Sequence, residues 1–187
     1  KTFPKQNSLL EGGKQELLSE KDFVAKIIAA REAKLNQDFM IIARTEALIA
    51  GMGIDEALKR AYAYEDAGAN AILIHSKKNT PDEVFEFADK WDGKVSLIVV
   101  PTSYPSVGLD ELIEHKIKMV IYANQTLRVA YTAMSRVLKE INQVNKLTEI
   151  KEEMTSMEKI FHLQEMYNIK KEEKDIESEL KKLGYLK

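Results

Sequence analysis

Arg44 and His75 each come at the end of a short apolar run, and both side chains can hold an anionic group. Arg44 ends FMIIAR, and His75 directly follows AILI. A guanidinium beside a buried strand is costly to desolvate unless it meets an anion, and its planar fork matches carboxylate or phosphate. Position alone leaves two interpretations open. Arg44 either binds a ligand or pairs with an acid such as Glu46, and His75 is either functional or structural.

Four further polar residues are candidates for the same chemistry. Lys5 offers a mobile cation and Asn7 offers uncharged amide donors, both useful around a transferring phosphoryl group. From the residues alone, an ordinary solvated loop is the better explanation of both. Thr102 in VVPTSYP either donates its hydroxyl or only shapes a turn. Asn124 either lines a site or caps the helix that begins at Gln125.

Four apolar runs rich in β-branched residues predict the strands that must position these side chains. They do not alternate with polar residues, which is typical of parallel strands buried on both faces. The runs lie within residues 38–47, 70–78, 95–103 and 118–126. Each is abruptly followed by polar residues, and neighbouring parallel strands end at one edge of a sheet. Arg44 and His75 could therefore face one site.

Amphipathic segments between these runs predict helices, at residues 19–34, 54–69, 79–91, 108–116 and 125–143. Ser19 and Thr80 are the expected N-caps of the first and third. The repeating strand–helix unit indicates an α/β fold. No glycine-rich phosphate turn follows a strand, whereas polar residues end all four, which favours a (β/α)8 barrel. Such a barrel needs about 250 residues, so we expect the C-terminal half of one.

The predicted domains are residues 1–147, containing a loop and the half barrel, and residues 148–187, a charged helical extension. The chain has 187 residues, a net charge of −2 and no cysteine. Nothing in this composition indicates a nucleic-acid or membrane partner, and the lack of cysteine excludes disulfides and thiol nucleophiles. No apolar stretch approaches the roughly 18 residues that span a bilayer. We expect a cytoplasmic protein.

KTFPKQNSLLEGG together with DFMIIARTEALIAGMGIDEALKRAYAYEDAGANAILIHSKK resembles the phosphoenolpyruvate mutase and isocitrate lyase superfamily, most closely its mutase branch. The resemblance implies a TIM barrel whose gating loop contains Lys5 and Asn7, so that the chain would begin inside this loop and lack four strands. It implies an isomerase that interconverts phosphoenolpyruvate and phosphonopyruvate in phosphonate biosynthesis. It also implies a Mg²⁺ cofactor held by carboxylates upstream, with no metal ligand in this chain.

The same resemblance assigns roles to individual residues. Lys5, Asn7, Arg44 and His75 would be catalytic, with Asn7, Arg44 and His75 also binding the phosphoryl group and Ser8 binding substrate beside them. The lyases use a cysteine in the gating loop, which this chain lacks. Relatives that hydrolyse phosphonopyruvate typically carry threonine where Asn7 stands, so Asn7 favours a mutase.

Two alternatives stay open. One is phosphonopyruvate hydrolase, and the other is a non-catalytic half-barrel fragment that binds partners through its exposed strand edges. The resemblance also implies a homo-oligomer, a homotetramer built as a dimer of dimers that exchange the helix at residues 125–145. The apolar positions of that helix would equally suit packing on its own barrel.

Overall fold

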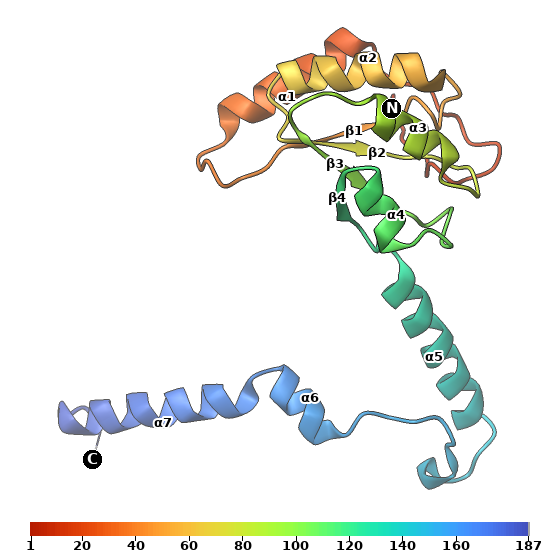
Figure 1. Cartoon of the computed structure of the whole chain (residues 1–187). Coiled ribbons are helices and arrows are strands. Elements are labelled where there is room, and N and C mark those ends of the chain that lie inside the picture. Colours follow the sequence, from red (N-terminus) through yellow and green to blue (C-terminus); the bar gives the residue numbers. More distant parts are fainter. Residues whose placement is uncertain (187) are drawn as a thin grey trace. The chain divides into compact units, whose positions relative to one another are not determined.

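Four short parallel strands, in the order β1-β2-β3-β4, form the single sheet of the structure. The structure is a computed structural model, and it describes residues 1–186. The elements are α1 (Glu20–Ala33), β1 (Ile42–Thr45), α2 (Gly53–Asp66), β2 (Ala71–Ile74), α3 (Asp82–Lys90), β3 (Ser96–Val99), α4 (Leu109–Glu114), β4 (Ile117–Val120), α5 (Gln125–Ile141), a 3₁₀ turn (Leu147–Glu149), α6 (Met157–Leu163) and α7 (Met166–Lys182). All four predicted strands are present, and helices alternate with them (Figure 1).

One face of the sheet is covered by helices. Ile72, Ile74 and Val99 point to this face and belong to one buried cluster with Tyr64 of α2 and Phe87 of α3. Helix α2 packs against β1 and β2 and against its neighbours α1 and α3. This layer fixes the positions of the strand ends.

The opposite face carries a second, smaller apolar cluster. Ala71, Leu73, Ile98 and Val100 form it, with Ile121 packed against them. Side chains alternate between the faces of a strand, so the central strands β2 and β3 are apolar and buried on both sides, as their sequences predicted. The same prediction is wrong for β1 and β4, which lie at the edges of the sheet and are partly exposed. This arrangement is that of a parallel α/β sheet, and the predicted fold class is confirmed.

The predicted N-caps meet different outcomes. Ser19 caps α1, and its hydroxyl accepts the backbone N–H of Asp22 at 3.1 Å. The prediction for Thr80 is wrong, because Pro81 holds the N-cap position of α3. The Thr80 hydroxyl instead donates to the carboxylate of Asp82 at 2.8 Å. Pro81 has helical dihedral angles, and the helix itself begins at the next residue, Asp82.

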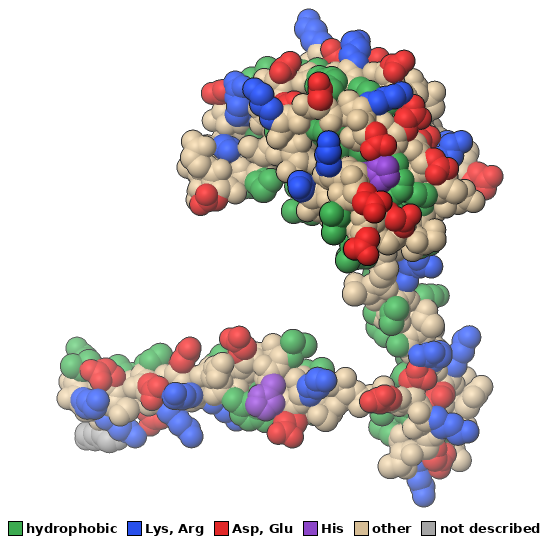
Figure 2. All heavy atoms as spheres, in the orientation of Figure 1, with side chains coloured by type: hydrophobic (Ala, Val, Ile, Leu, Met, Phe, Trp, Pro, Cys, Tyr) green, Lys and Arg blue, Asp and Glu red, His purple; other side chains and the backbone are tan. Residues whose placement is uncertain are grey.

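Two compact units make up the chain, residues Lys1–Gln125 and Thr126–Lys187. The second unit has no buried residue on its helices, and charges of both signs alternate along them (Figure 2). The predicted domain boundary after residue 147 is a division by sequence pattern and stays a prediction. Within residues 1–186, no helix has the length and apolar character that crossing a membrane requires.

Candidate active site

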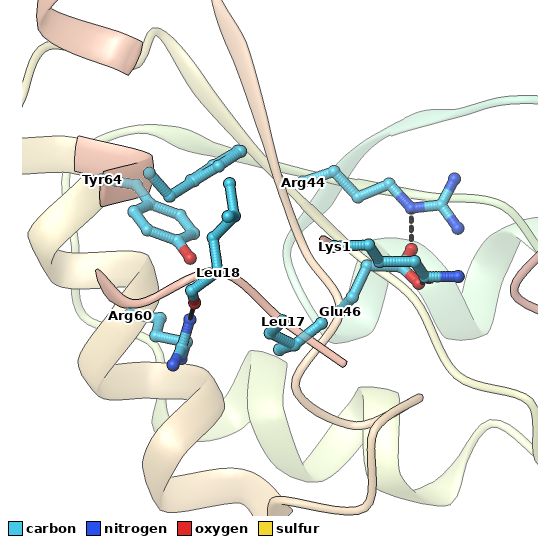
Figure 3. A pocket seen from close by; sticks show the side chains of 8 residues that line it. Lys1, Leu17, Leu18, Arg44, Glu46, Arg60 and Tyr64 are labelled. Carbon is cyan, nitrogen blue, oxygen red and sulfur yellow. Dashed lines mark hydrogen bonds and ion pairs between the residues drawn. The ribbon is translucent and has the colours of Figure 1, made fainter. Parts of the chain in front are cut away.

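The carboxyl end of β1 holds a buried carboxylate that gathers donors from two parts of the chain. Glu46 lies just after β1 with only 9% of its side chain exposed. Nε of Arg44 donates to Oε1 of Glu46, as Figure 3 shows, and the Ser8 hydroxyl donates to Oε2 at 2.6 Å. Nζ of Lys1 lies 3.2 Å from the same Oε2. The first eight residues are thereby tied to the end of the strand.

Charge and burial act in opposite directions on Glu46. Burial alone would raise the pKa of the Glu46 carboxyl, but the hydrogen bond from Ser8 and the charges of Arg44 and Lys1 outweigh it, so the pKa is lowered. Glu46 is therefore ionised at neutral pH and anchors Arg44 through Nε. Nη2 of Arg44 donates to Ser8 Oγ at 3.1 Å. Arg44 keeps 40% of its side chain exposed, so part of its fork stays open to a ligand.

A second anchor holds the segment that follows the N-terminal loop. Arg60 of α2 is buried, donates from Nη1 to the backbone carbonyl of Leu18 at 3.0 Å and pairs with Glu56 at 2.7 Å. Figure 3 shows Arg60 and Leu18 on the far side of a small pocket from Arg44 and Glu46. The loop is thus fixed at both of its ends.

Arg44 and His75 line one open cavity of about 290 Å³. Asn7 and Ser8 of the N-terminal loop line it as well. Strands β1 and β2 are parallel neighbours, with Arg44 paired to Leu73, so residue 75 ends its strand beside the end of β1. Two loop residues and two strand-end residues that lie far apart in sequence therefore share one space. Whether they act chemically there stays a prediction.

His75 is held neutral in this cavity. Its side chain is nearly fully buried, at 3% exposure, and its Nδ1 has no hydrogen-bond partner among residues 1–186. Burial, with a smaller contribution from the positive charge of Arg44, lowers the pKa of His75 to about 4. A neutral imidazole can donate or accept one hydrogen bond without adding charge.

Asn7 keeps its amide donors available because a local turn uses its other atoms. Oδ1 of Asn7 accepts the backbone N–H of Leu9 at 2.9 Å, and the backbone carbonyl accepts from Gln15 at 3.2 Å. None of the hydrogen bonds in the described part of the chain uses its Nδ2. An exposed loop residue is thereby oriented by its own backbone, with two N–H groups free for a ligand.

Lys5 does not line the cavity that Arg44, His75 and Asn7 share. It is exposed and lines an adjacent opening of about 330 Å³, which Arg44, Ser8, Lys1 and Glu46 also line. Sequence reasoning considered Glu46 only as a partner of Arg44 and did not identify Lys1. No local signal marks Lys1, because its contact with Glu46 joins residues 45 positions apart in the chain.

Two strand-end residues complete the cavity. Thr102 follows β3 and Asn124 follows β4, and Nδ2 of Asn124 donates to Thr102 Oγ1 at 3.3 Å. Oδ1 of Asn124 is buried without a partner among the described residues. The interpretation of Asn124 as a helix cap is therefore wrong, since a cap would accept a backbone N–H of α5 through this oxygen.

The residues present do not form a metal site by themselves. Across residues 1–186, no group of three or more His, Cys, Asp or Glu side chains is placed to hold a metal ion. Glu46, the carboxylate of this cluster, is already occupied by three donors. A metal ion here would need ligands in addition to those that the described residues provide.

Comparison with known proteins identifies relatives that match most of this chain. A curated phosphonopyruvate hydrolase of Variovorax sp. is 45% identical over 165 residues, covering 88% of this chain and 57% of the relative. A phosphoenolpyruvate phosphomutase of Tetrahymena pyriformis is 41% identical over 174 residues, covering 93% of this chain and 58% of the relative. The chain thus spans little more than half the length of these relatives.

Solved structures show the same fold. A phosphoenolpyruvate phosphomutase of Streptomyces platensis subsp. rosaceus superposes with a TM-score of 0.87 at 42% identity, covering 92% of this chain and 60% of that one. A phosphonopyruvate hydrolase in complex with oxalate and Mg²⁺ gives 0.82 at 42% identity, over 91% and 58%. The sheet and its helices correspond to part of their TIM barrel. Residues 5–142 match the family described as phosphoenolpyruvate phosphomutase, and the chain belongs to this family.

Proposed function

We propose that the protein is a phosphoenolpyruvate mutase, which interconverts phosphoenolpyruvate and phosphonopyruvate. In this reaction the bond from phosphorus to the enol oxygen breaks, and a bond from phosphorus to the methylene carbon forms. No atom is gained or lost. The observation that carries the proposal is the single cavity lined by Arg44, His75 and Asn7 in a chain of this family.

The side chains of this cavity suit a group that migrates while remaining anionic. Arg44, anchored through Nε to Glu46, would hold the phosphoryl oxygens with the rest of its fork. Asn7 would add uncharged donors from Nδ2, and neutral His75 would contact the same group. Fixed donors of this kind stabilise charge without reorganising during the reaction. Ser8 would position Arg44, since it bonds both Arg44 and Glu46, and Lys5 would act from the loop.

Magnesium is part of the proposal, although the described residues do not form its site. Its support is the hydrolase structure solved with oxalate and Mg²⁺. When bound, the ion would polarise the oxygen atoms of the pyruvyl group. Titration with Mg²⁺ and oxalate, followed by calorimetry, tests whether this chain binds them without further ligands.

The alternative is phosphonopyruvate hydrolysis, which the 45% identity to the Variovorax hydrolase favours. Phosphorus NMR with phosphonopyruvate separates the two activities. A mutase produces phosphoenolpyruvate, whereas a hydrolase releases inorganic phosphate. We expect phosphoenolpyruvate from the wild type and some added phosphate release from Asn7→Thr, with Gln6→Ala on the same loop as the matched control. Prompt phosphate release by the wild type would establish the hydrolase and contradict the proposal.

We further propose that the protein forms a cytoplasmic homo-oligomer through α5. The apolar side chains of α5 are widely exposed, at 70% for Leu127, 58% for Met134 and 66% for Leu138. Such a stripe is typical of a helix that packs against a partner. Light scattering on the wild type and on Leu138→Asp tests this, with a lower oligomeric state expected for the variant. An unchanged mass would contradict the proposed role of α5.

A further inference from the structure

We propose that Thr102, oriented by Asn124, is a further substrate-contacting residue, and that its hydroxyl donates a hydrogen bond to an oxygen of the phosphoryl or phosphonyl group. This inference rests on the proposed function. It concerns the side of the cavity formed by the ends of β3 and β4, which the roles assigned to Asn7, Arg44 and His75 leave unused.

The hydrogen bonds around Thr102 leave its hydroxyl hydrogen free. A threonine hydroxyl has one hydrogen to donate and two lone pairs that accept. Nδ2 of Asn124 donates to Thr102 Oγ1 at 3.3 Å, which occupies one lone pair. No hydrogen bond in the described residues uses the Thr102 O–H as donor. The bond from Asn124 therefore orients the oxygen and leaves a donor for a ligand in the cavity.

The backbone of Thr102 is also fixed. Its N–H donates to the carbonyl of Val100 at 2.8 Å in the turn that ends β3. Pro101 precedes it and is buried. The side chain thus projects from a rigid strand end. Donors held in place before the ligand arrives lose little entropy on binding.

The charge of the cavity selects an anionic ligand. Arg44 is its charged residue, His75 is neutral, and none of the residues lining it carries a carboxylate. Strands β1 and β3 lie on either side of β2, so the backbones at their ends are about 10 Å apart. A tetrahedral oxyanion bound between these two strand ends can direct some of its oxygen atoms toward Arg44 and others toward Thr102.

Asn124 is the positioning residue in this arrangement. Its Oδ1 is buried without a partner among residues 1–186, a costly state for a side chain with no task beyond packing. Neutral His75 has the same feature at Nδ1, and it lines the same cavity. Nδ1 of His75 can donate a hydrogen bond, so an oxyanion in the cavity would complete its hydrogen bonding, whereas Oδ1 of Asn124 only accepts and leaves Asn124 its contact with Thr102.

The experiment compares the binding of two ligands to the protein in the presence of Mg²⁺. Phosphonopyruvate carries the phosphonyl group, whereas oxalate resembles the pyruvyl part and lacks it. We expect Thr102→Val to weaken phosphonopyruvate binding about ten- to a hundredfold, the usual effect of one hydrogen bond to a charged group, and to leave oxalate binding within twofold. Thr102→Ser should bind both like the wild type. Thr102→Ala provides a second test should the valine variant not fold.

Asn124→Ala should weaken phosphonopyruvate binding less than Thr102→Val does. It should add nothing in the Thr102→Val background, because it acts through that hydroxyl. Unchanged phosphonopyruvate binding by Thr102→Val overturns the inference, and so does an equal loss for both ligands, which would mean that Thr102 only shapes the loop. Absence of phosphonopyruvate binding by the wild type overturns the proposed function and this inference with it.

Discussion

Replacing Glu46 by glutamine should destabilise the protein by about 2–4 kcal/mol at pH 7. The substitution keeps the shape of the side chain but removes the charge that Lys1, Arg44 and Ser8 share. Hydrogen bonds to an ionised group contribute about 1.5–3 kcal/mol each, roughly twice the contribution of neutral ones. Breaking a buried ion pair costs about 3–5 kcal/mol, and we take a lower figure because Arg44 is 40% exposed and partly hydrated.

Urea unfolding, followed by the fluorescence of the single tryptophan, Trp91, measures this difference. Glu16→Gln is the matched control, since Glu16 is also ion-paired, with Lys14 at 2.6 Å, but is exposed. We expect the control to unfold close to the wild type. If the free energy of unfolding of Glu46→Gln differs from that of the wild type by less than about 1 kcal/mol, the buried network does not hold the N-terminal loop to β1.

The pH dependence gives an independent test of the same reasoning. The pKa of Glu46 is lowered from its ordinary value of 4.5 in the folded state. An acid of this kind contributes its stability above pH 4.5 and loses it as the pH falls through the lower, folded-state pKa. The advantage of the wild type over Glu46→Gln should therefore shrink below pH 4.5. A constant difference from pH 7 to pH 3 would contradict an ionised Glu46.

Three further outcomes are expected. Arg44→Lys should lower kcat/KM for phosphonopyruvate about a hundredfold in steady-state kinetics. The planar guanidinium can hydrogen-bond Glu46 through Nε and hold an oxyanion with its other nitrogens, whereas the single ammonium of lysine cannot do both. The pKa of His75 is lowered from 6.5 to about 4, so the unfolded chain binds more protons in this range. The wild type should lose about 3 kcal/mol of stability between pH 6.5 and 4, and His75→Gln should lack this loss in urea titrations. Gly68→Ala should lower the free energy of unfolding by 1 kcal/mol or more in urea, because Gly68 has a φ of +103° and a Cβ there would lie 2.6 Å from the Arg31 side chain.

The strand positions could be predicted because their cause is local. Each run of apolar β-branched residues forms a strand, with β2 and most of β3 buried on both faces and the edge strands β1 and β4 partly exposed, and parallel neighbours in sequence order place their carboxyl ends together. The shared cavity of Arg44 and His75 follows from this order alone. Ser19 was likewise predictable as an N-cap, since its partner Asp22 is only three residues away.

The contacts that join distant segments could not be predicted. The bond from Ser8 to Glu46 spans 38 residues, and nothing near either residue indicates the path of the loop. Asn124 illustrates the same limit. Its sequence position before a helix favoured a cap as one of two alternatives, but its amide donates a hydrogen bond to Thr102, which lies 22 residues earlier. A tertiary contact prevailed over a local preference, which cap statistics cannot anticipate.

The electrostatics of the cavity fit a group that must be held equally well before and after it moves. Arg44 is the charged residue that lines the cavity, Lys1 and Glu46 pair with each other outside its lining, and His75 adds no charge. The site therefore presents one net positive charge together with neutral donors. Contacts to the three outer oxygens of a phosphoryl group do not depend on whether its fourth bond goes to oxygen or to carbon. Stronger positive charge would stabilise the bound states as much as the transition state and would not speed the transfer. If Asn7 and Thr102 act as proposed, such fixed neutral donors around one anchored guanidinium would favour migration of the phosphoryl group over tighter binding of either bound state.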